Sequence, residues 1–205
     1  MGKRLFDLVF AASALLALAP LLAVLALWVR LDSPGPVLYR QTRVGRYGQT
    51  FRIAKFRTMH VGADQAGPAI TVGADARITR AGHFLRRTKL DELPQFANVL
   101  LGDMSVVGPR PEVPRYVALY PPDVAQQVLS VRPGITDMAS LTFRDESTLL
   151  AKSSDPEHTY VHEILPAKLH YACEYVRTRT LWLDLRIIAL TAAAVWSSPR
   201  PGQKP

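Results

Sequence analysis

Residues 8–29 read LVFAASALLALAPLLAVLALWV, and none of these side chains carries a charge. As an α-helix rising about 1.5 Å per residue, a stretch of this length crosses a bilayer core of about 30 Å. Lys3 and Arg4 precede it, as in a signal peptide, and residues 17–19 (ALA) mimic a cleavage site. Because the apolar run continues well past that site, we expect the segment to stay attached as a membrane helix.

A proline interrupts this apolar run near its middle. Pro20 removes one helical hydrogen bond and can kink a helix. Basic residues flank both ends, with Lys3 and Arg4 before the run and Arg30 and a basic segment after it. Length alone favours a simple span, but basic flanks tend to remain cytoplasmic and a span would place one of them outside. We therefore predict a re-entrant membrane helix over residues 1–32, with both ends in the cytoplasm.

The remainder of the chain is long enough for one soluble domain. The protein has 205 residues, with 25 Lys and Arg against 17 Asp and Glu, for a formal net charge of +8. This balance predicts an acidic partner, which would be nucleic acid, anionic lipid or a phosphorylated substrate. Cys173 is the only cysteine, which excludes a disulfide framework, and the five histidines lack the spacing of a zinc site.

The pattern after the membrane segment predicts mainly helices. Residues 37–41 and 51–56 read as two strands of a hairpin around a turn at 45–48. Residues 60–77 and 142–157 read as loops. Helical patterns cover residues 81–88, 91–102, 111–130 and 159–177.

The C-terminal run, residues 181–196, is apolar but contains Asp184 and Arg186. Its uncharged remainder is too short to span a bilayer. With a tryptophan near each end, it would lie in the membrane interface, and a core-packing helix is an equal alternative.

These patterns together predict an α+β protein in three parts. A re-entrant membrane helix occupies residues 1–32, and a small, mostly helical domain with a β-hairpin and an interfacial C-terminal helix occupies 33–196. Residues 197–205 read as a disordered tail. The strand–helix alternation of a Rossmann-type nucleotide-sugar domain is missing, which argues against a processive glycosyltransferase.

Residues 86–95 read RRTKLDELPQ and place two adjacent carboxylates, Asp91 and Glu92, at the start of an amphipathic helix. Pro94 fits only a first helical turn, which puts Asp91 at or near the N-cap. Helix N-terminal amides favour an ionised carboxylate and also favour phosphate. Asp91 is then a metal ligand or a nucleophile, and a plain N-cap with a solvated neighbour is the alternative.

Six short motifs occur in the order typical of bacterial sugar transferases, the small monotopic phosphoglycosyl transferases, and the chain resembles that family over about residues 3–196. The motifs are KRLFD (3–7), KFRTM (55–59), LDELPQ (90–95), GDMS (102–105), VGPRP (107–111) and PGIT (133–136). Each motif alone is weak, whereas six in order are highly specific.

The resemblance implies a reaction and roles for the two carboxylates. Members of the family move a phospho-sugar from a UDP-sugar onto undecaprenyl phosphate and release UMP. Asp91 would be the nucleophile that forms a covalent phospho-sugar enzyme, and Glu92, together with Asp91, would bind Mg²⁺. Phosphoryl transfer requires an oxygen nucleophile and neutralisation of the phosphate charge, and Mg²⁺ is usually held by carboxylates together with substrate phosphates.

The resemblance also assigns four cations to the substrate phosphates. Arg110 matches the family's phosphate-binding arginine, since a guanidinium can clamp phosphate bidentately. Lys55, Arg86 and Arg144 match further basic positions. Beside Arg144, other family positions are replaced, with Asp137 and Phe143 for glycines and Ser140 for glutamine. These replacements suggest altered contacts to the nucleotide or the sugar.

The expected partners are a UDP-sugar, undecaprenyl phosphate and membrane lipid, without nucleic acid, and a homodimer is left open. The expected location is the bacterial inner membrane, with the catalytic domain on the cytoplasmic face. The main alternative is a non-enzymatic basic module that binds anionic lipid or nucleic acid from a membrane tether. That alternative explains the net charge but not the two carboxylates between arginines.

Overall fold

The computed structural model describes residues 2–63, 70–73 and 75–196, and it has the expected α+β composition. The predicted tail at 197–205 and part of the predicted loop at 60–77 lie outside the described residues. In chain order the elements are α1 (Gly2–Asp32), β1 (Leu38–Val44), η1 (Arg46–Gly48), β2 (Thr50–Phe56), α2 (Arg80–Thr88), η2 (Leu90–Glu92), α3 (Gln95–Leu101), β3 (Ser105–Val107), α4 (Pro114–Val117), α5 (Pro122–Val128), β4 (Gly134–Thr136), α6 (Met138–Thr142), α7 (Glu146–Leu150), α8 (Pro156–Thr159), η3 (Tyr160–Ile164), α9 (Leu165–Thr178) and α10 (Leu181–Trp196).

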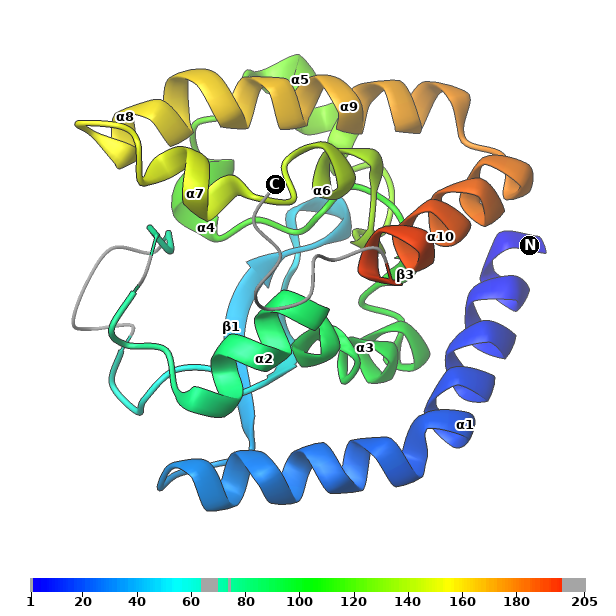
Figure 1. Cartoon of the computed structure of the whole chain (residues 1–205). Helices are drawn as coiled ribbons and strands as arrows, with labels where there is room; N and C mark the ends of the chain where they lie inside the picture. The colour runs from blue at the N-terminus through cyan, green and yellow to red at the C-terminus, as the bar shows by residue number, and fades with distance from the viewer. Residues whose placement is uncertain (1, 64–69, 74, 197–205) are drawn as a thin grey trace.

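The hairpin is confirmed and lies in the middle of the molecule, with α9 on one side and α2 and α3 on the other (Figure 1). β1 and β2 pair antiparallel from Leu38 opposite Phe56 to Val44 opposite Thr50. From β2, Ile53 enters a core that also contains buried side chains of α3, β3, α9 and α10. The hairpin therefore anchors the elements on both of its sides.

The structure contains a second pair of strands, which are parallel and were not predicted from the sequence. β3 and β4 pair with Ser105 opposite Gly134 and Val107 opposite Thr136. Each strand has three residues, too few to display the period of two by which strands are recognised. Pro133 leads into β4, which begins at Gly134.

Prolines explain two other differences from the predicted elements. The helix expected over 111–130 is wrong, because Pro121 and Pro122 separate two shorter helices, α4 and α5. The loop expected over 142–157 contains α7 and the start of α8. Asp155 caps α8 by accepting from the His158 N–H at 3.0 Å, and Pro156 occupies the first helical turn.

The apolar helix α1 bends sharply near its middle and borders the domain along two sides (Figure 1). Its only proline is Pro20. Among the described residues, α1 is the one helix that is long enough and apolar enough to cross a membrane. Only 11% of its most apolar 18-residue stretch is buried inside the protein. Since little of it packs inside the protein, most of its apolar surface faces outward.

Both halves of α1 nevertheless contact the same domain. In the first half, the Lys3 ammonium lies 2.7 Å from Asp184 of α10, and Asp7 accepts from the Ser105 hydroxyl of β3 at 3.0 Å. In the second half, Leu25 packs in one cluster with Phe56 and Leu85. The KRLFD motif is thus explained by contacts that fasten the start of α1.

Arg57 fastens the other end of α1. Its buried guanidinium donates to the Ser33 carbonyl at 2.7 Å, to the Ser33 hydroxyl at 3.0 Å and to the Val29 carbonyl at 3.3 Å. These carbonyls have no helical partner where a helix ends. The arginine of the KFRTM motif therefore ties the end of β2 to the end of α1.

The C-terminal helix α10 packs against the core, as one of the two alternatives drawn from its sequence expects, and its place in a membrane interface stays a prediction. Asp184 and Ile187 are buried, and the Asp184 carboxylate accepts from the Tyr175 hydroxyl at 2.7 Å. The opposite surface leaves Trp182 77% exposed, together with Leu185 and Leu190. One face of α10 is part of the core, and an apolar face remains outside.

Candidate active site

A tight turn after α2 carries Asp91 and Glu92 into the interior. Lys89 ends α2 in the left-handed conformation, with φ 58°, and its N–H donates to the Arg86 carbonyl. The 3₁₀ turn η2 follows directly, and both carboxylates in it are buried. The expectation that Asp91 caps the next helix is wrong, because α3 begins at Gln95 and Pro94 occupies the capping position.

Glu92 is held by two cations from distant parts of the chain. Lys55 Nζ of β2 lies 2.8 Å from Glu92 Oε1. Arg110 Nη1 donates to Oε2 at 3.1 Å, and Arg110 Nη2 contacts Oε1. Burial raises the pKa of Glu92, but Arg110 and Lys55 outweigh it and hold that pKa well below its usual range. Glu92 is therefore an anion clamped between two cations.

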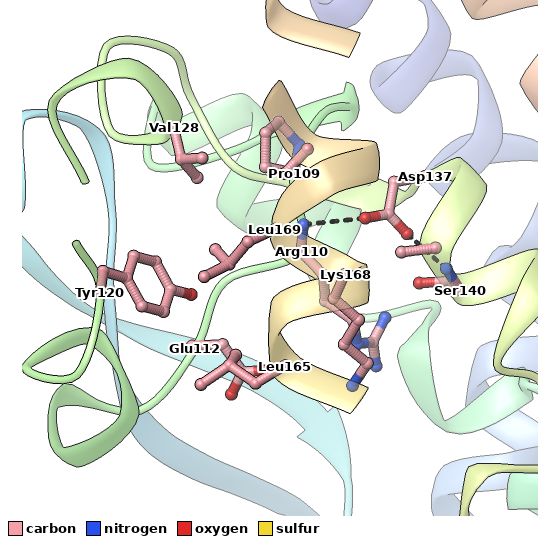
Figure 2. Close-up of a pocket in the computed structure, with 12 residues that line it drawn as sticks. Pro109, Arg110, Glu112, Tyr120, Val128, Asp137, Ser140, Leu165, Lys168 and Leu169 are labelled. Carbon is pink, nitrogen blue, oxygen red and sulfur yellow. Dashed lines mark hydrogen bonds between the residues drawn. The ribbon is translucent and has the colours of Figure 1, made fainter. Parts of the chain in front are cut away.

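The parallel strands β3 and β4 position Arg110. Their carboxyl ends meet at one edge, where Arg110 follows β3 and Asp137 follows β4. The Arg110 N–H donates to Asp137 Oδ2 at 3.2 Å, and Asp137 Oδ1 accepts from the Ser140 N–H at 2.7 Å (Figure 2). Asp137 thus supports the turn of Arg110 and the start of α6.

Two glycines permit this strand pairing. A Cβ on Gly134 would collide with the backbone of Gly108, and a Cβ on Gly108 would lie 2.6 Å from the Arg132 carbonyl oxygen. The glycines of the VGPRP and PGIT motifs are therefore explained by one close approach of two backbones.

A second ion-pair network lies behind Arg110. Glu112 accepts from the Tyr160 hydroxyl at 2.7 Å and lies 3.5 Å from Arg43 of β1. Arg43 also donates to the Pro111 carbonyl at 3.0 Å. Because Pro111 and Glu112 directly follow Arg110, these contacts fix the same turn from its far side.

Asp91 has a different environment from its neighbour. Its side chain is 7% exposed, and its Oδ1 has no hydrogen-bond partner among the described residues. Burial raises the pKa of Asp91, while the charges of Lys55, Lys89 and Arg86 lower it. The negative charge of Glu92 raises it as well, and burial prevails, so the pKa of Asp91 lies above its usual value.

The structure brings Lys55 and Arg110 into contact with Glu92, and Arg86 near enough to influence the charge of Asp91. Arg86 of α2 donates to the Thr58 hydroxyl at 2.9 Å and the Thr71 hydroxyl at 3.0 Å. Arg144 lies half-buried just after α6. The assignment of Arg144 to a substrate phosphate stays a prediction.

A pocket opens beside Arg110, between α6 and α9 (Figure 2). Tyr120, Lys168 and Leu169 line it, with Lys168 extending alongside Arg110 (Figure 2). The Lys168 ammonium is also paired with Glu146. Lys168 therefore places a second cation, paired with Glu146, on the side of Arg110 that faces α9.

A divalent cation would have few protein ligands here. Within the described parts of the chain, no group of three or more His, Cys, Asp and Glu side chains could hold a metal ion. Asp91 and Glu92 suit Mg²⁺, which is commonly held by one or two carboxylates and substrate phosphates. Asp91 Oδ1 is unpaired, whereas a metal on Glu92 would share that carboxylate with Lys55 and Arg110.

Sequence reasoning missed several residues that build the site. Glu112 and Tyr160 support the Arg110 turn, and Gln95 and Asn98 are buried amides of α3, the helix that follows the carboxylates. Gln95 is the last residue of the LDELPQ motif, and Asp137 directly follows the PGIT motif. Their place in or directly after a motif was a signal, but only the contacts distinguish support from chemistry.

The site thus combines two buried carboxylates with two cations that contact Glu92, in a chain that also carries a helix of membrane length. The chain belongs to the bacterial sugar transferase family, whose model matches residues 1–198.

Several characterised proteins resemble the chain. It is 40% identical over 192 residues, 92% of its length, to the UDP-glucose:undecaprenyl-phosphate glucose-1-phosphate transferase of Escherichia coli (strain K12). It is 37% identical over 206 residues to the protein of the same name from Caulobacter vibrioides, covering 95% of the chain and 70% of the relative. It is 35% identical over 195 residues, 94% of its length, to the UDP-N-acetylgalactosamine-undecaprenyl-phosphate N-acetylgalactosaminephosphotransferase of Aeromonas hydrophila. The chain spans only 39% of the E. coli relative and 43% of the Aeromonas relative.

Proposed function

We propose that the protein transfers a phospho-sugar from a UDP-sugar to undecaprenyl phosphate and releases UMP. This would be the first membrane step in assembling a glycoconjugate such as a capsule, O-antigen, exopolysaccharide or glycoprotein glycan. The observation that carries the proposal is the pair Asp91–Glu92, buried next to Lys55 and Arg110. The names of the relatives describe the same kind of reaction.

The proposed reaction has two halves. An oxygen of Asp91 attacks the phosphorus that carries the sugar, the bond from this phosphorus to the oxygen of UMP breaks, and UMP leaves. An oxygen of undecaprenyl phosphate then attacks the same phosphorus, which frees the Asp91 carboxylate and yields a diphosphate-linked lipid. The unpaired Oδ1 of Asp91 supports the nucleophile assignment, because no described residue donates a hydrogen bond to it.

The cations would stabilise the charge that develops on the phosphates. Arg110 and Lys55 border Glu92, and Arg86 and Arg144 would extend the positive surface. Glu92 and Asp91 would hold Mg²⁺ together with phosphate oxygens, and the ion would neutralise part of the phosphate charge. Glu92 also keeps Lys55 and Arg110 oriented.

The proposed location is the cytoplasmic face of the bacterial inner membrane, with α1 as a re-entrant helix. Contacts from both halves of α1 to one domain support this topology, since Lys3 and Arg57 fasten its two ends to that domain. A straight helix of 31 residues would be about 46 Å long, and it would hold one of its ends away from the domain. The exposed apolar face of α10, with Trp182, would lie in the interface.

The test is to incubate the purified full chain with undecaprenyl phosphate and a panel of UDP-sugars while following UMP release. Since the relatives are named for glucose and N-acetylgalactosamine, the panel includes both sugars. We expect UMP release with at least one donor and its loss on magnesium removal. Salt-dependent retention of DNA without UMP release would instead favour the non-enzymatic binding module.

A further inference from the structure

Two buried amide side chains on α3 differ sharply in their partners. Asn98 is fully paired, because its Oδ1 accepts from the Ala54 N–H at 2.9 Å and its Nδ2 donates to the Arg52 carbonyl at 2.9 Å and to Asp103 at 3.1 Å. Gln95 is 1% exposed, yet neither its Oε1 nor its Nε2 has a partner among the described residues. Asn98 joins α3 to β2, and Gln95 makes no comparable link.

A buried amide without partners opposes folding, because it gives up its hydrogen bonds to water and gains none. An apolar side chain of similar size would fill the same space without that loss. Packing alone therefore does not account for glutamine at position 95. Such an orphaned group calls for a partner that is not part of the fold.

The unpaired atoms of Gln95 and Asp91 lie on neighbouring turns of one continuous helical segment. Leu93 and Pro94 have helical backbone angles, so η2 runs into α3 without a break. The Leu93, Phe96 and Ala97 N–H groups each donate to the carbonyl three residues back, so Gln95 lies one turn beyond the carboxylate pair, on the side of Glu92. Three buried polar atoms without described partners, Asp91 Oδ1 and both polar atoms of Gln95, thus lie on adjacent turns.

We propose that Gln95 is a substrate-contacting residue of this site, and that its Nε2–H donates to an oxygen of the phosphoryl group that Asp91 attacks. The inference rests on the proposed function and adds a residue to it. Ionised phosphate oxygens only accept hydrogen bonds, so the amide nitrogen is the matching atom. Oε1 is then available to a hydroxyl of the sugar on the same phosphate.

The test replaces Gln95 with leucine, which has a similar size and no polar atoms. We expect Gln95→Leu to unfold at the same or a higher temperature than the parent, because it removes two unpaired buried atoms. We expect its rate of UMP release from the UDP-sugar alone to fall about tenfold or more, since a hydrogen bond to a charged group is lost. Stability and activity would therefore move in different directions.

Asn98→Leu is the matched control on the same helix. It leaves the Ala54 N–H and the Arg52 carbonyl without their partner, so its unfolding temperature should fall. A Gln95→Leu midpoint that falls as far as the control, or an unchanged rate of UMP release, overturns the proposal. If the parent releases no UMP with any donor, the proposed function itself fails, and with it the phosphoryl partner assigned to Gln95.

Discussion

At the residue scale, Asp91 and Glu92 are adjacent in sequence but differ in what surrounds them. Arg110 and Lys55 overcome the effect of burial and hold the pKa of Glu92 well below its usual range. Burial raises the pKa of Asp91, against the opposing charge of Lys55. Neighbouring acids with pKa values pushed apart commonly perform different tasks. This difference fits a permanent anion at Glu92 and a reactive carboxylate at Asp91.

The first prediction concerns the pH dependence of turnover. Asp91 must be ionised to attack phosphorus, so activity is lost as the pH falls through its pKa. The charge of Lys55 lowers that pKa, so Lys55→Met should raise it and move the acidic limb of kcat/KM to higher pH. The measurement is a pH profile of UMP release for parent and variant.

Arg40→Met is the control, because Arg40 is an exposed cation on the neighbouring strand β1. It should leave the acidic limb unchanged. An acidic limb that stays in place in Lys55→Met would show that Asp91 ionisation does not limit the reaction.

The second prediction concerns the fork of Arg110. Arg110→Lys keeps the charge but cannot reach both oxygens of Glu92, and it offers phosphate only a point charge. We expect kcat/KM to fall roughly tenfold to more than a hundredfold, which corresponds to about 1.5–3 kcal/mol, with little change in unfolding temperature. Arg115→Lys, at an exposed ion pair, should stay within about twofold of the parent. Equal kinetics in the two variants would leave Arg110 a purely structural role.

At the element scale, the short parallel pair β3–β4 determines where Arg110 and Asp137 meet. The close approach of Gly108 and Gly134 allows the two strands to pair at this point. The strands are short, so the geometry depends on very few backbone contacts.

The third prediction follows from that close approach. A methyl group at position 134 would collide with backbone atoms of Gly108, which cannot move aside as a side chain would. Gly134→Ala should destabilise the protein by about 1–3 kcal/mol and reduce turnover, because the Arg110 turn must shift. Thermal unfolding checks the first effect. Gly2→Ala is the control, since a Cβ at Gly2 meets no atom within 4 Å, and equal stability of both variants would contradict the account.

The elements that could be predicted from sequence are those with a long enough pattern. The hairpin and α2 displayed their periods, and their observed bounds differ little from the prediction. β3 and β4 were too short to display one, and the pairing of two distant segments is a tertiary property. The single helix predicted over 111–130 ignored the pair Pro121–Pro122, which ends one helix and starts another.

The candidate site was predictable where motif order identified residues, and unpredictable where only contacts assign a role. Lys55 and Arg110 contact Glu92, which follows Asp91 directly, and the roles that the resemblance gives these four residues stay predictions. The capping role expected of Asp91 failed because the chain adopts a 3₁₀ turn before α3. Spacing along the chain does not reveal which neighbours a buried residue will have.

At the scale of the whole molecule, α1 and the domain form one body despite the apolar surface of α1. Lys3, Arg4 and Asp7 bind α10, α3 and β3 at one end, and Arg57 binds the other end. A buried charge is costly once its partner is removed, and moving the start of α1 away from the domain would separate Lys3 from Asp184 and Asp7 from β3. This favours a topology in which neither end is pulled across the bilayer.

The fourth prediction tests that topology in cells. In a Cys173→Ala background, which removes a buried thiol, Gly2→Cys should resist a membrane-impermeant thiol reagent added from the periplasmic side. Ser153→Cys on the domain should behave in the same way, and both should react after permeabilisation. Efficient labelling of Gly2→Cys before permeabilisation would mean that α1 crosses the bilayer.

The covalent role of Asp91 is the central claim, and intact-protein mass spectrometry tests it most directly. The full chain is incubated with the active UDP-sugar alone, without undecaprenyl phosphate, and its mass is compared with that of Asp91→Asn. Asparagine keeps the shape of aspartate but lacks the anionic oxygen, so folding should survive. We expect one added phospho-sugar on the parent with release of one UMP, and none on Asp91→Asn. An adduct on Asp91→Asn, or substantial turnover by that variant with both substrates, would contradict it.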